Sequence, residues 1–258
     1  KLNIGDLKRN KFKINLHELE LEELFHIEKL LKFVSKNGFP NYFGYQRFGK
    51  DVKENLEKAK DLLFGDAIIK DRKVAKMLLS AYQSTFFNAW LVERLKLDNS
   101  GFKLLDGDIF YDIKNEKLFT PKSINEKIIE DFKEKLITPT GLLPGRDVFK
   151  AKDDALKIEQ KYDDSEITEK GYRREAIVFP EILSSKYDKL NKSCSLDFIL
   201  PKGSYATVLI ELLANRNFGW KIRLKESFLI IKIVDLTTIF LWKSYIIWVK
   251  IDFIIYCY

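Results

Sequence analysis

The sequence contains only two cysteines, two histidines and one methionine in 258 residues, and this scarcity excludes several kinds of site. A zinc site built from nitrogen and sulfur needs about four ligands, and no C-x-x-C pair is present, so we expect no metal. Nothing around Cys194 indicates an activated thiol nucleophile. Cysteines without an evident partner are typical of a reducing compartment, so we expect a cytoplasmic protein.

The chain also lacks a secretion signal and a long uncharged apolar run. It begins KLNIGDLKRNKFKI, with neither methionine nor an apolar signal core, so we expect that sequence precedes it. A membrane helix needs about twenty largely uncharged residues. The apolar stretch after residue 218 is interrupted too often for that by Lys232, Asp235, Lys243, Lys250 and Asp252. No membrane partner is therefore expected.

The residues that are present predict a folded, basic protein. Apolar residues make up 46% of the chain and charged residues 32%, so disorder is not expected. A chain of this length forms one large domain or two smaller ones. The net charge of +7 favours a polyanionic partner, either nucleic acid or an acidic membrane surface, without choosing between them.

Apolar periodicity predicts a mixture of helices and strands. Helices are expected over 21–37, with a C-cap at Asn37-Gly38, and over 51–64, 73–96 and 151–170. A strand is expected from residue 8 to Leu16, a small β unit over 101–122, and a strand, a turn and a helix over 193–213. The segment TPTGLLPG at 138–145 is expected to be a turn-rich loop. The acidic residues before the first helix are interpreted as complementing its dipole.

The most unusual stretch is GFPNYFGYQRFG at 38–49, which holds five aromatic residues, three glycines and one arginine. Aromatic faces and arginine planes hold unstacked bases, and each base-on-ring contact contributes about 1–3 kcal/mol. The stretch is therefore compatible with binding of single-stranded or looped RNA. It is equally compatible with a hydrophobic plug where a loop meets a sheet, and composition alone leaves both interpretations open.

Longer strings in the chain resemble one known family. PNYFGYQRFG at 40–49 closely resembles the PNYFG-x-QRFG signature of the TruD family of tRNA pseudouridine synthases. The family's other segments resemble strings that follow in the same order: KLNIGDLKRNKFKI, SAYQSTFFNAWLVERL, TGLLPG, GYRREAIVFP and LPKGSYATVLIELL. The resemblance covers residues 1 to about 215.

The resemblance implies an isomerase that detaches uracil from C1′ of its ribose and rejoins it through C5. The implied substrate is tRNA, typically the uridine at position 13 of the D-arm, and no cofactor is implied. The target base must leave its stack to be reached. Phe12 would stack on the uracil. Asn10 would hold the active-site loop or the aspartate by hydrogen bonding, and Arg47 would contact phosphate or support the loop. The residues that match substrate-binding positions are Asn10, Phe12, Asn41, Phe43, Gly44, Gln46, Arg47, Phe48, Arg173 and Arg174.

Two departures from the family pattern bear on activity. The family's nucleophilic aspartate lies in a G-x-K-D-x-x-A motif, which these 258 residues do not contain, so we expect it upstream of Lys1 and expect this chain alone to be inactive. Residues 219–258 form an atypical apolar tail, interpreted either as a buried strand pair or, preferably, as a frameshifted end. A non-catalytic RNA-binding fragment and a nonfunctional relic are the alternatives to the enzyme.

The resemblance further implies an α+β fold, in which a TruD-specific α/β insertion interrupts a catalytic pseudouridine synthase domain with a mixed, largely antiparallel sheet. Residues 1–39 and 179–218 would be parts of the catalytic domain, and residues 40–178 would be the insertion domain. A monomer is expected.

Overall fold

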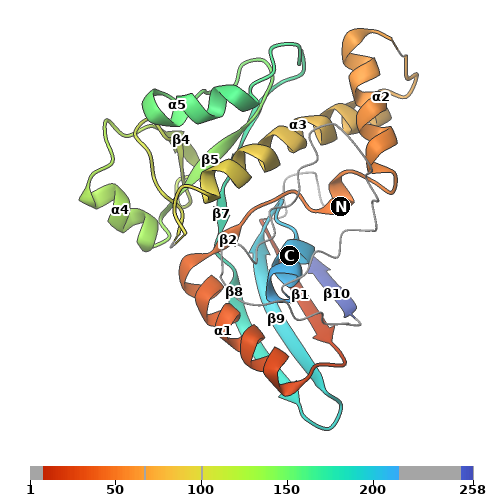
Figure 1. Ribbon diagram of the computed structural model, residues 1–258, viewed down its shortest axis with the longest axis vertical. Coiled ribbons are helices and arrows are strands. Elements are labelled where there is room, and N and C mark those ends of the chain that lie inside the picture. Colours follow the sequence, from red (N-terminus) through yellow and green to blue (C-terminus); the bar gives the residue numbers. More distant parts are fainter. Residues whose placement is uncertain (1–7, 67, 100, 215–250, 258) are drawn as a thin grey trace. The chain divides into compact units, whose positions relative to one another are not determined.

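The computed structural model describes residues 8–66, 68–99, 101–214 and, as backbone, 251–257 (Figure 1). These residues divide into two compact units. One consists of residues 8–41, 178–214 and 251–257, and the other of residues within 42–177. The predicted boundaries lie close to these bounds. Compactness does not identify a catalytic domain, however, so the assignment of catalytic and insertion domains stays a prediction.

The first unit is built on a four-stranded antiparallel sheet in the order β10-β1-β9-β8. Its strands are β1 (Arg9–Leu16), β8 (Glu181–Asp188), β9 (Ser193–Pro201) and β10 (Ile251–Cys257). Side chains alternate along β1, where Phe12, Ile14 and Leu16 are buried while Lys13 is exposed. This alternation gives the sheet one apolar face and one polar face, as a half-covered antiparallel sheet requires.

Two helices complete the first unit. Helix α1 (Leu21–Asn37) begins with a capping box, in which the Glu20 amide donates to the Glu23 carboxylate at 2.7 Å. It ends at Gly38, as its sequence predicts, and it packs against β8 and α6 (Ala206–Leu213). The buried side chains of α1 recur at helical spacing and include Leu24, Ile27 and Leu31.

The second unit combines a helical hairpin with a second antiparallel sheet. Helices α2 (Val52–Phe64) and α3 (Arg72–Leu95) pack against each other, and α3 also packs on the sheet (Figure 1). The strand order is β4-β3-β5-β6, from β3 (Phe110–Asp112), β4 (Lys117–Phe119), β5 (Ile137–Leu143) and β6 (Tyr172–Glu175). The shorter helices are η1 (Tyr45–Arg47), α4 (Glu126–Lys133), α5 (Asp153–Glu159) and η2 (Gln160–Tyr162). Strands β2 (Phe39–Pro40) and β7 (Ile177–Val178) form a separate two-stranded sheet.

Two sequence predictions need correction in this unit. The turn-rich loop predicted over 138–145 is wrong, because residues Ile137–Leu143 form the fully buried strand β5. Pro139 lies where this strand changes its partner from β3 to β6, so its missing amide hydrogen leaves both ladders intact. The helix predicted over 151–170 is only partly correct, since it ends at Glu159 and a short 3-10 turn follows.

Helices packed on antiparallel sheets confirm the predicted α+β class. None of the helices in the described part of the chain has the length and hydrophobicity that crossing a bilayer requires. Residues 219–250 of the predicted atypical tail lie outside the described residues. Residues 251–257 form β10, which pairs with β1 along its length.

Candidate functional site

The aromatic loop 41–49, all but its first residue in the second unit, adopts a defined conformation in which two glycines take part. Gly44 has an extended backbone and precedes the 3-10 turn η1, whose first bond runs from the Arg47 amide to the Gly44 carbonyl at 2.9 Å. Gly49 has φ of +75°, a left-handed value that favours glycine. A β-carbon at Gly49 would also lie 2.7 Å from Nδ2 of Asn55, which donates to the Phe48 carbonyl. The glycines therefore permit the tight return of the loop to α2.

The side chain of Asn88 on α3 holds the centre of the loop through hydrogen bonds to the loop backbone. The Phe43 amide donates to Oδ1 of Asn88 at 2.9 Å, and Nδ2 of Asn88 donates to the Phe43 carbonyl at 3.0 Å. The Phe43 ring meets Phe87 edge-on with 5.7 Å between the ring centroids. A side-chain amide that satisfies both polar groups of one residue fixes that residue as a strand neighbour would.

Arg47 is directed toward the same helix. Its Nε donates to Oγ of Ser84 at 3.1 Å, and its Nη2 donates to the Ser80 carbonyl at 3.2 Å and to the Ser80 hydroxyl. The guanidinium also lies 5.4 Å from the centroid of the Phe43 ring. Because Ser84 is fully buried, these bonds form away from bulk water and are stronger for it.

Arg173 and Arg174 are neighbours on β6 and reach different partners, because consecutive side chains of a strand point to opposite faces. The Arg174 guanidinium lies 3.9 Å from the centroid of Phe43 and 5.5 Å from that of Phe87. Its Nη2 donates to the Tyr42 carbonyl at 3.4 Å. On β5, Gly141 is the residue paired with Arg174.

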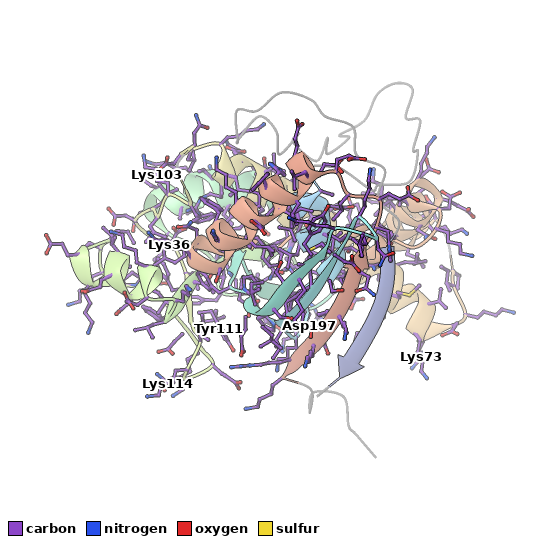
Figure 2. The ribbon with its side chains drawn as sticks, turned by 90° about the horizontal axis from the view of Figure 1, so that it is seen from below. Lys36, Lys73, Lys103, Tyr111, Lys114 and Asp197 are labelled. Carbon is purple, nitrogen blue, oxygen red and sulfur yellow. The ribbon has the colours of Figure 1, made fainter. Side chains whose placement is uncertain are left out.

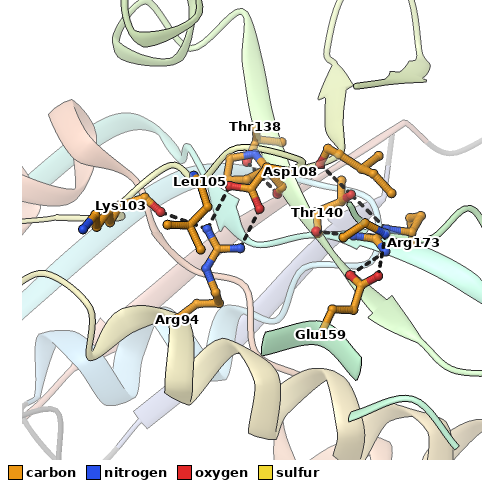
Figure 3. Close-up of polar contacts among 11 residues, drawn as sticks. Arg94, Lys103, Leu105, Asp108, Thr138, Thr140, Glu159 and Arg173 are labelled. Atoms are coloured by element: carbon orange, nitrogen blue, oxygen red, sulfur yellow. Dashed lines mark hydrogen bonds and ion pairs between the residues drawn. The ribbon is translucent and has the colours of Figure 1, made fainter. Parts of the chain in front are cut away.

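Arg173 belongs to a buried polar group beside the sheet (Figure 3). It donates to the carboxylate of Glu159 at 2.6 Å and, through Nε and Nη2, to the hydroxyl and carbonyl of Thr140 at 3.1 and 2.5 Å. Burial lowers the pKa of this guanidinium, and the facing Glu159 opposes that shift. Arg173 also donates to the Phe149 carbonyl at 3.2 Å, so its hydrogen bonds join β6 to β5, to α5 and to the loop before α5.

A second buried ion pair lies in the same view. Arg94 of α3 donates from two nitrogens to Asp108 at 2.6 and 2.9 Å, and Nη2 also donates to the Lys103 carbonyl at 2.9 Å (Figure 3). The planar cation lies against the rings of Trp90 and Phe102. Both members of the pair are almost fully buried, so each compensates the charge of the other.

Three predicted site residues lie within the bounds of the first unit: Asn10, Phe12 and Asn41. Asn10 and Phe12 lie on β1, where Phe12 is buried and its ring stacks on Phe198 of β9 with 5.4 Å between centroids. The turn Lys202–Ser204 follows β9, and the Lys202 amide donates to the Lys8 carbonyl at 3.0 Å.

In the structure, the guanidinium groups of Arg47 and Arg174 both lie beside the Phe43 ring. Gly44 and Phe48 belong to the same loop as Phe43. Asn41 is 2% exposed, whereas Gln46 is exposed to solvent. The supporting residues Ser80, Ser84 and Asn88 were not predicted as part of the site. The sequence nevertheless contained a signal for them. These three polar residues recur at every fourth position of the helix, on a face whose other residues are mostly apolar.

Gln46 of the loop is exposed and Phe48 is partly exposed, whereas the Phe43 ring is contacted by Phe87, Arg47 and Arg174. An exposed amide, a partly exposed ring and a backbone of fixed shape are groups that can contact a base. Within the part of the chain that the structure describes, no three His, Cys, Asp or Glu residues are grouped so that they could hold a metal. Burial raises the pKa of the neighbouring Tyr42 hydroxyl, so it stays protonated at neutral pH.

Comparison with known proteins identifies the family. Residues 1–70 and 67–212 match the family model described as tRNA pseudouridine synthase D (TruD). The curated tRNA pseudouridine synthase D of Nitratiruptor sp. is 36% identical over 244 residues, which cover 84% of this chain and 67% of that protein. The protein of the same name from Wolinella succinogenes is 37% identical over 245 residues, with the same coverage of both chains.

A solved structure agrees in fold. The crystal structure described as TruD from Methanosarcina mazei superposes with a TM-score of 0.60 at 20% identity, covering 83% of this chain and 70% of that one. Its low identity limits this match to the fold. The sequence matches, together with the aromatic loop 41–49 held on α3, show that the chain belongs to the TruD family of tRNA pseudouridine synthases.

Proposed function

We propose that the protein acts on uridine 13 in the D-arm of tRNA, and that it requires a nucleophilic aspartate from a segment upstream of Lys1. In this reaction the bond from N1 of uracil to C1′ breaks, a bond from C5 to C1′ forms, the proton on C5 is lost to water, and N1 gains a proton from water. On this proposal, the 258-residue chain binds tRNA but does not turn it over. Residues 40–178 act as the insertion domain and the remainder to residue 218 as parts of the catalytic domain.

One observation carries the proposal: the aromatic loop 41–49, called the signature loop from here on, is fixed on α3. Asn88 fixes the backbone of Phe43 by accepting from its amide and donating to its carbonyl, and Arg47 is held by Ser80 and Ser84. A loop whose shape is set before binding loses little conformational entropy when RNA arrives. A loop held in one conformation favours RNA binding. A nonfunctional relic, the alternative considered above, would have no use for it.

The residue roles follow from these contacts. Gln46 is exposed and is proposed to contact RNA directly, together with the rings of Phe43 and Phe48. Arg47, Arg173 and Arg174 make contacts within the protein and are proposed as positioning residues. Phe12 on β1 is proposed to stack on the target base, and Asn10 on the same strand is proposed to hold the active-site loop or the aspartate by hydrogen bonding. Asn41 and Gly44 are proposed to set the backbone of the loop.

The test uses an unmodified tRNA transcript labelled with tritium at C5 of its uridines, because isomerisation releases that label. The 258-residue chain is compared with a longer chain that includes the upstream G-x-K-D-x-x-A segment, and with the same longer chain carrying Asp→Ala in that motif. We expect release only from the intact longer chain, at position 13 by primer extension. Release from the 258-residue chain would contradict the upstream nucleophile, and release at another uridine would contradict the position.

The support of the loop is tested separately with Asn88→Ala. Loss of two hydrogen bonds to Phe43 removes about 1–3 kcal/mol of local stability. We therefore expect faster amide hydrogen exchange at residues 42–48 and weaker tRNA binding. Thr85→Ala on the same helix is the matched control, because among the described residues its hydroxyl donates only to the Tyr82 carbonyl, within α3. Equal exchange in both variants would contradict the role of Asn88.

A monomer in the cytoplasm, working without a metal, completes the proposal. Unchanged tRNA binding in the presence of a chelator and a single species by light scattering are the expected results. Loss of binding after chelation, or a dimer at micromolar concentration, would contradict this part alone.

A further inference from the structure

The free end of the α2–α3 hairpin carries an exposed surface that the signature loop does not use. Helix α3 is exposed over its first turns, and its core-facing pattern begins only at Leu78. The exposed apolar residues there are Phe64 (61% exposed), Ile68 (92%), Val74 (39%) and Met77 (57%). Apolar side chains clustered at one end of an element indicate an interaction surface more often than chance exposure does.

Four cations lie among these apolar groups: Lys70, Arg72, Lys73 and Lys76. In the described part of the chain, none of the four makes a side-chain hydrogen bond or ion pair. By contrast, Lys58 on α2 pairs with Glu54 of the same helix. Lys73 is labelled in Figure 2 near the start of α3, where its side chain extends away from the ribbon.

The only carboxylate between residues 68 and 77 is that of Asp71, and it is already used. It caps α3 by accepting from the amides of Lys73 and Val74 at 2.8 and 3.3 Å. Arg72 and Lys76 lie four residues apart on the helix, and Lys73 and Lys76 three apart, so like charges face each other. This repulsion is relieved when an anion binds.

We propose that the hairpin tip, defined as Phe64, Ile68, Lys70, Arg72, Lys73, Val74, Lys76 and Met77, binds the sugar-phosphate backbone of tRNA outside the signature loop. The inference rests on the proposed function, because it assumes that the chain acts on tRNA. RNA fits this surface better than a protein partner does, since the cores of protein interfaces are depleted in lysine. Cations beside an exposed ring are the combination that holds a nucleic acid strand.

The position of the tip on α3 supports one continuous RNA path. The signature loop is held on this helix at Ser80 and Ser84. Arg72 lies eight residues before Ser80, which is roughly 12 Å along a helix axis. A bound strand can therefore contact the loop and the tip on one rigid helix.

The test measures tRNA affinity and its dependence on salt for three proteins: the 258-residue chain, a tip variant and a charge-matched control. The tip variant carries Lys70→Gln, Arg72→Gln, Lys73→Gln and Lys76→Gln. The control carries Lys117→Gln, Lys122→Gln, Lys127→Gln and Lys133→Gln, four exposed lysines of the same unit. Both variants lose the same net charge, so only the position of the charge differs.

We expect the tip variant to bind tRNA roughly ten-fold more weakly at low salt than the control. Its plot of log affinity against log salt should be less steep by about 3, because each phosphate contact contributes about 0.7–0.9 to the slope. Equal affinities and slopes for the two variants, with tight binding by the unchanged chain, would overturn the tip assignment and leave the proposed function standing. Absence of binding by the unchanged chain would overturn both.

The Phe64→Ser variant distinguishes an RNA partner of the hairpin tip from a protein partner. Weaker tRNA binding without a change in salt slope is expected if the ring contacts RNA. Unchanged tRNA binding in both Phe64→Ser and the tip variant would identify the surface as one for a protein and would overturn the proposal.

Discussion

At the scale of single residues, the most consequential charges of this protein are those without access to water. Arg94 and Asp108 neutralise each other in the interior, and one aspartate oxygen also accepts from the Leu105 amide. Breaking a buried pair costs more than the pair contributes, because the remaining ion keeps its desolvation penalty. Arg94 and Asp108 are therefore expected to be among the positions least tolerant of substitution.

Asp108→Asn tests this expectation. The substitution preserves the shape of the side chain and leaves Arg94 as an uncompensated buried cation. We expect the free energy of unfolding to fall by about 3–5 kcal/mol, measured by denaturant titration with circular dichroism. Asp154→Asn, which removes the fully exposed partner of Lys157, should leave the midpoint unchanged. Equal midpoints for the two variants would refute the importance of the buried pair.

His26 on α1 makes stability depend on pH. Burial, with a smaller contribution from nearby Lys29, lowers its pKa below the ordinary 6.5, and Nε2 has no hydrogen-bond partner among the residues that the structure describes. Because the unfolded chain then binds the proton more tightly, unfolding is favoured as the pH falls through 6.5 toward the folded-state pKa. The free energy of unfolding should fall over this window. In His26→Gln the fall should be smaller, and an identical pH profile would show that other groups cause it.

At the scale of elements, the helices were more predictable from sequence than the strands. The limits of α1, α2 and α3 follow from apolar spacing and from end residues such as Asp51, Asp71 and Gly38. Strand β5 was missed because it contains Pro139 and Gly141, residues that normally indicate a turn. Tertiary packing explains this sequence. A strand buried on both faces shows no alternation of apolar and polar residues. In addition, α3 packs so closely on β5 that only glycine fits at position 141.

The same limit applies to the site. The signature loop could be found from its sequence, and the family resemblance indicated that its residues bind substrate. That Arg47 and Arg173 are directed inward could not be predicted. Their partners Ser80, Ser84, Thr140 and Glu159 lie 14 to 37 residues away along the chain and become neighbours only in the fold.

Gly141→Ala tests the close packing of α3 on β5. A β-carbon at this position would lie 2.3 Å from the Trp90 ring and 2.9 Å from the Phe87 ring, so the helix must shift. We expect a loss of about 1–3 kcal/mol in the free energy of unfolding, by the same titration. Gly101→Ala is the matched control, since nothing lies within 4 Å of its added carbon. If the two substitutions have the same effect, the contact does not constrain the packing.

At the scale of the whole molecule, the terminal strand β10 covers one edge of β1. Deletion of residues 251–258 leaves that edge without its partner, and unpaired edges recruit strands of other chains. We expect the shortened chain to self-associate with increasing concentration in sedimentation experiments. The intact chain, measured at the same concentrations, is the control. A shortened chain that stays a single species would show that β1 does not need this neighbour.

The antiparallel pairing of β1 with β9 has a consequence for how the protein is made. The strand Arg9–Leu16 leaves the ribosome long before its partner Ser193–Pro201 exists. At about 5–20 residues per second, roughly 10–35 seconds separate the two. The described residues of the second unit all lie within 42–177, so they are synthesised during that interval. Translation therefore supplies the described residues of the second unit first, and β1 can pair with β9 only when the last residues of β9 emerge.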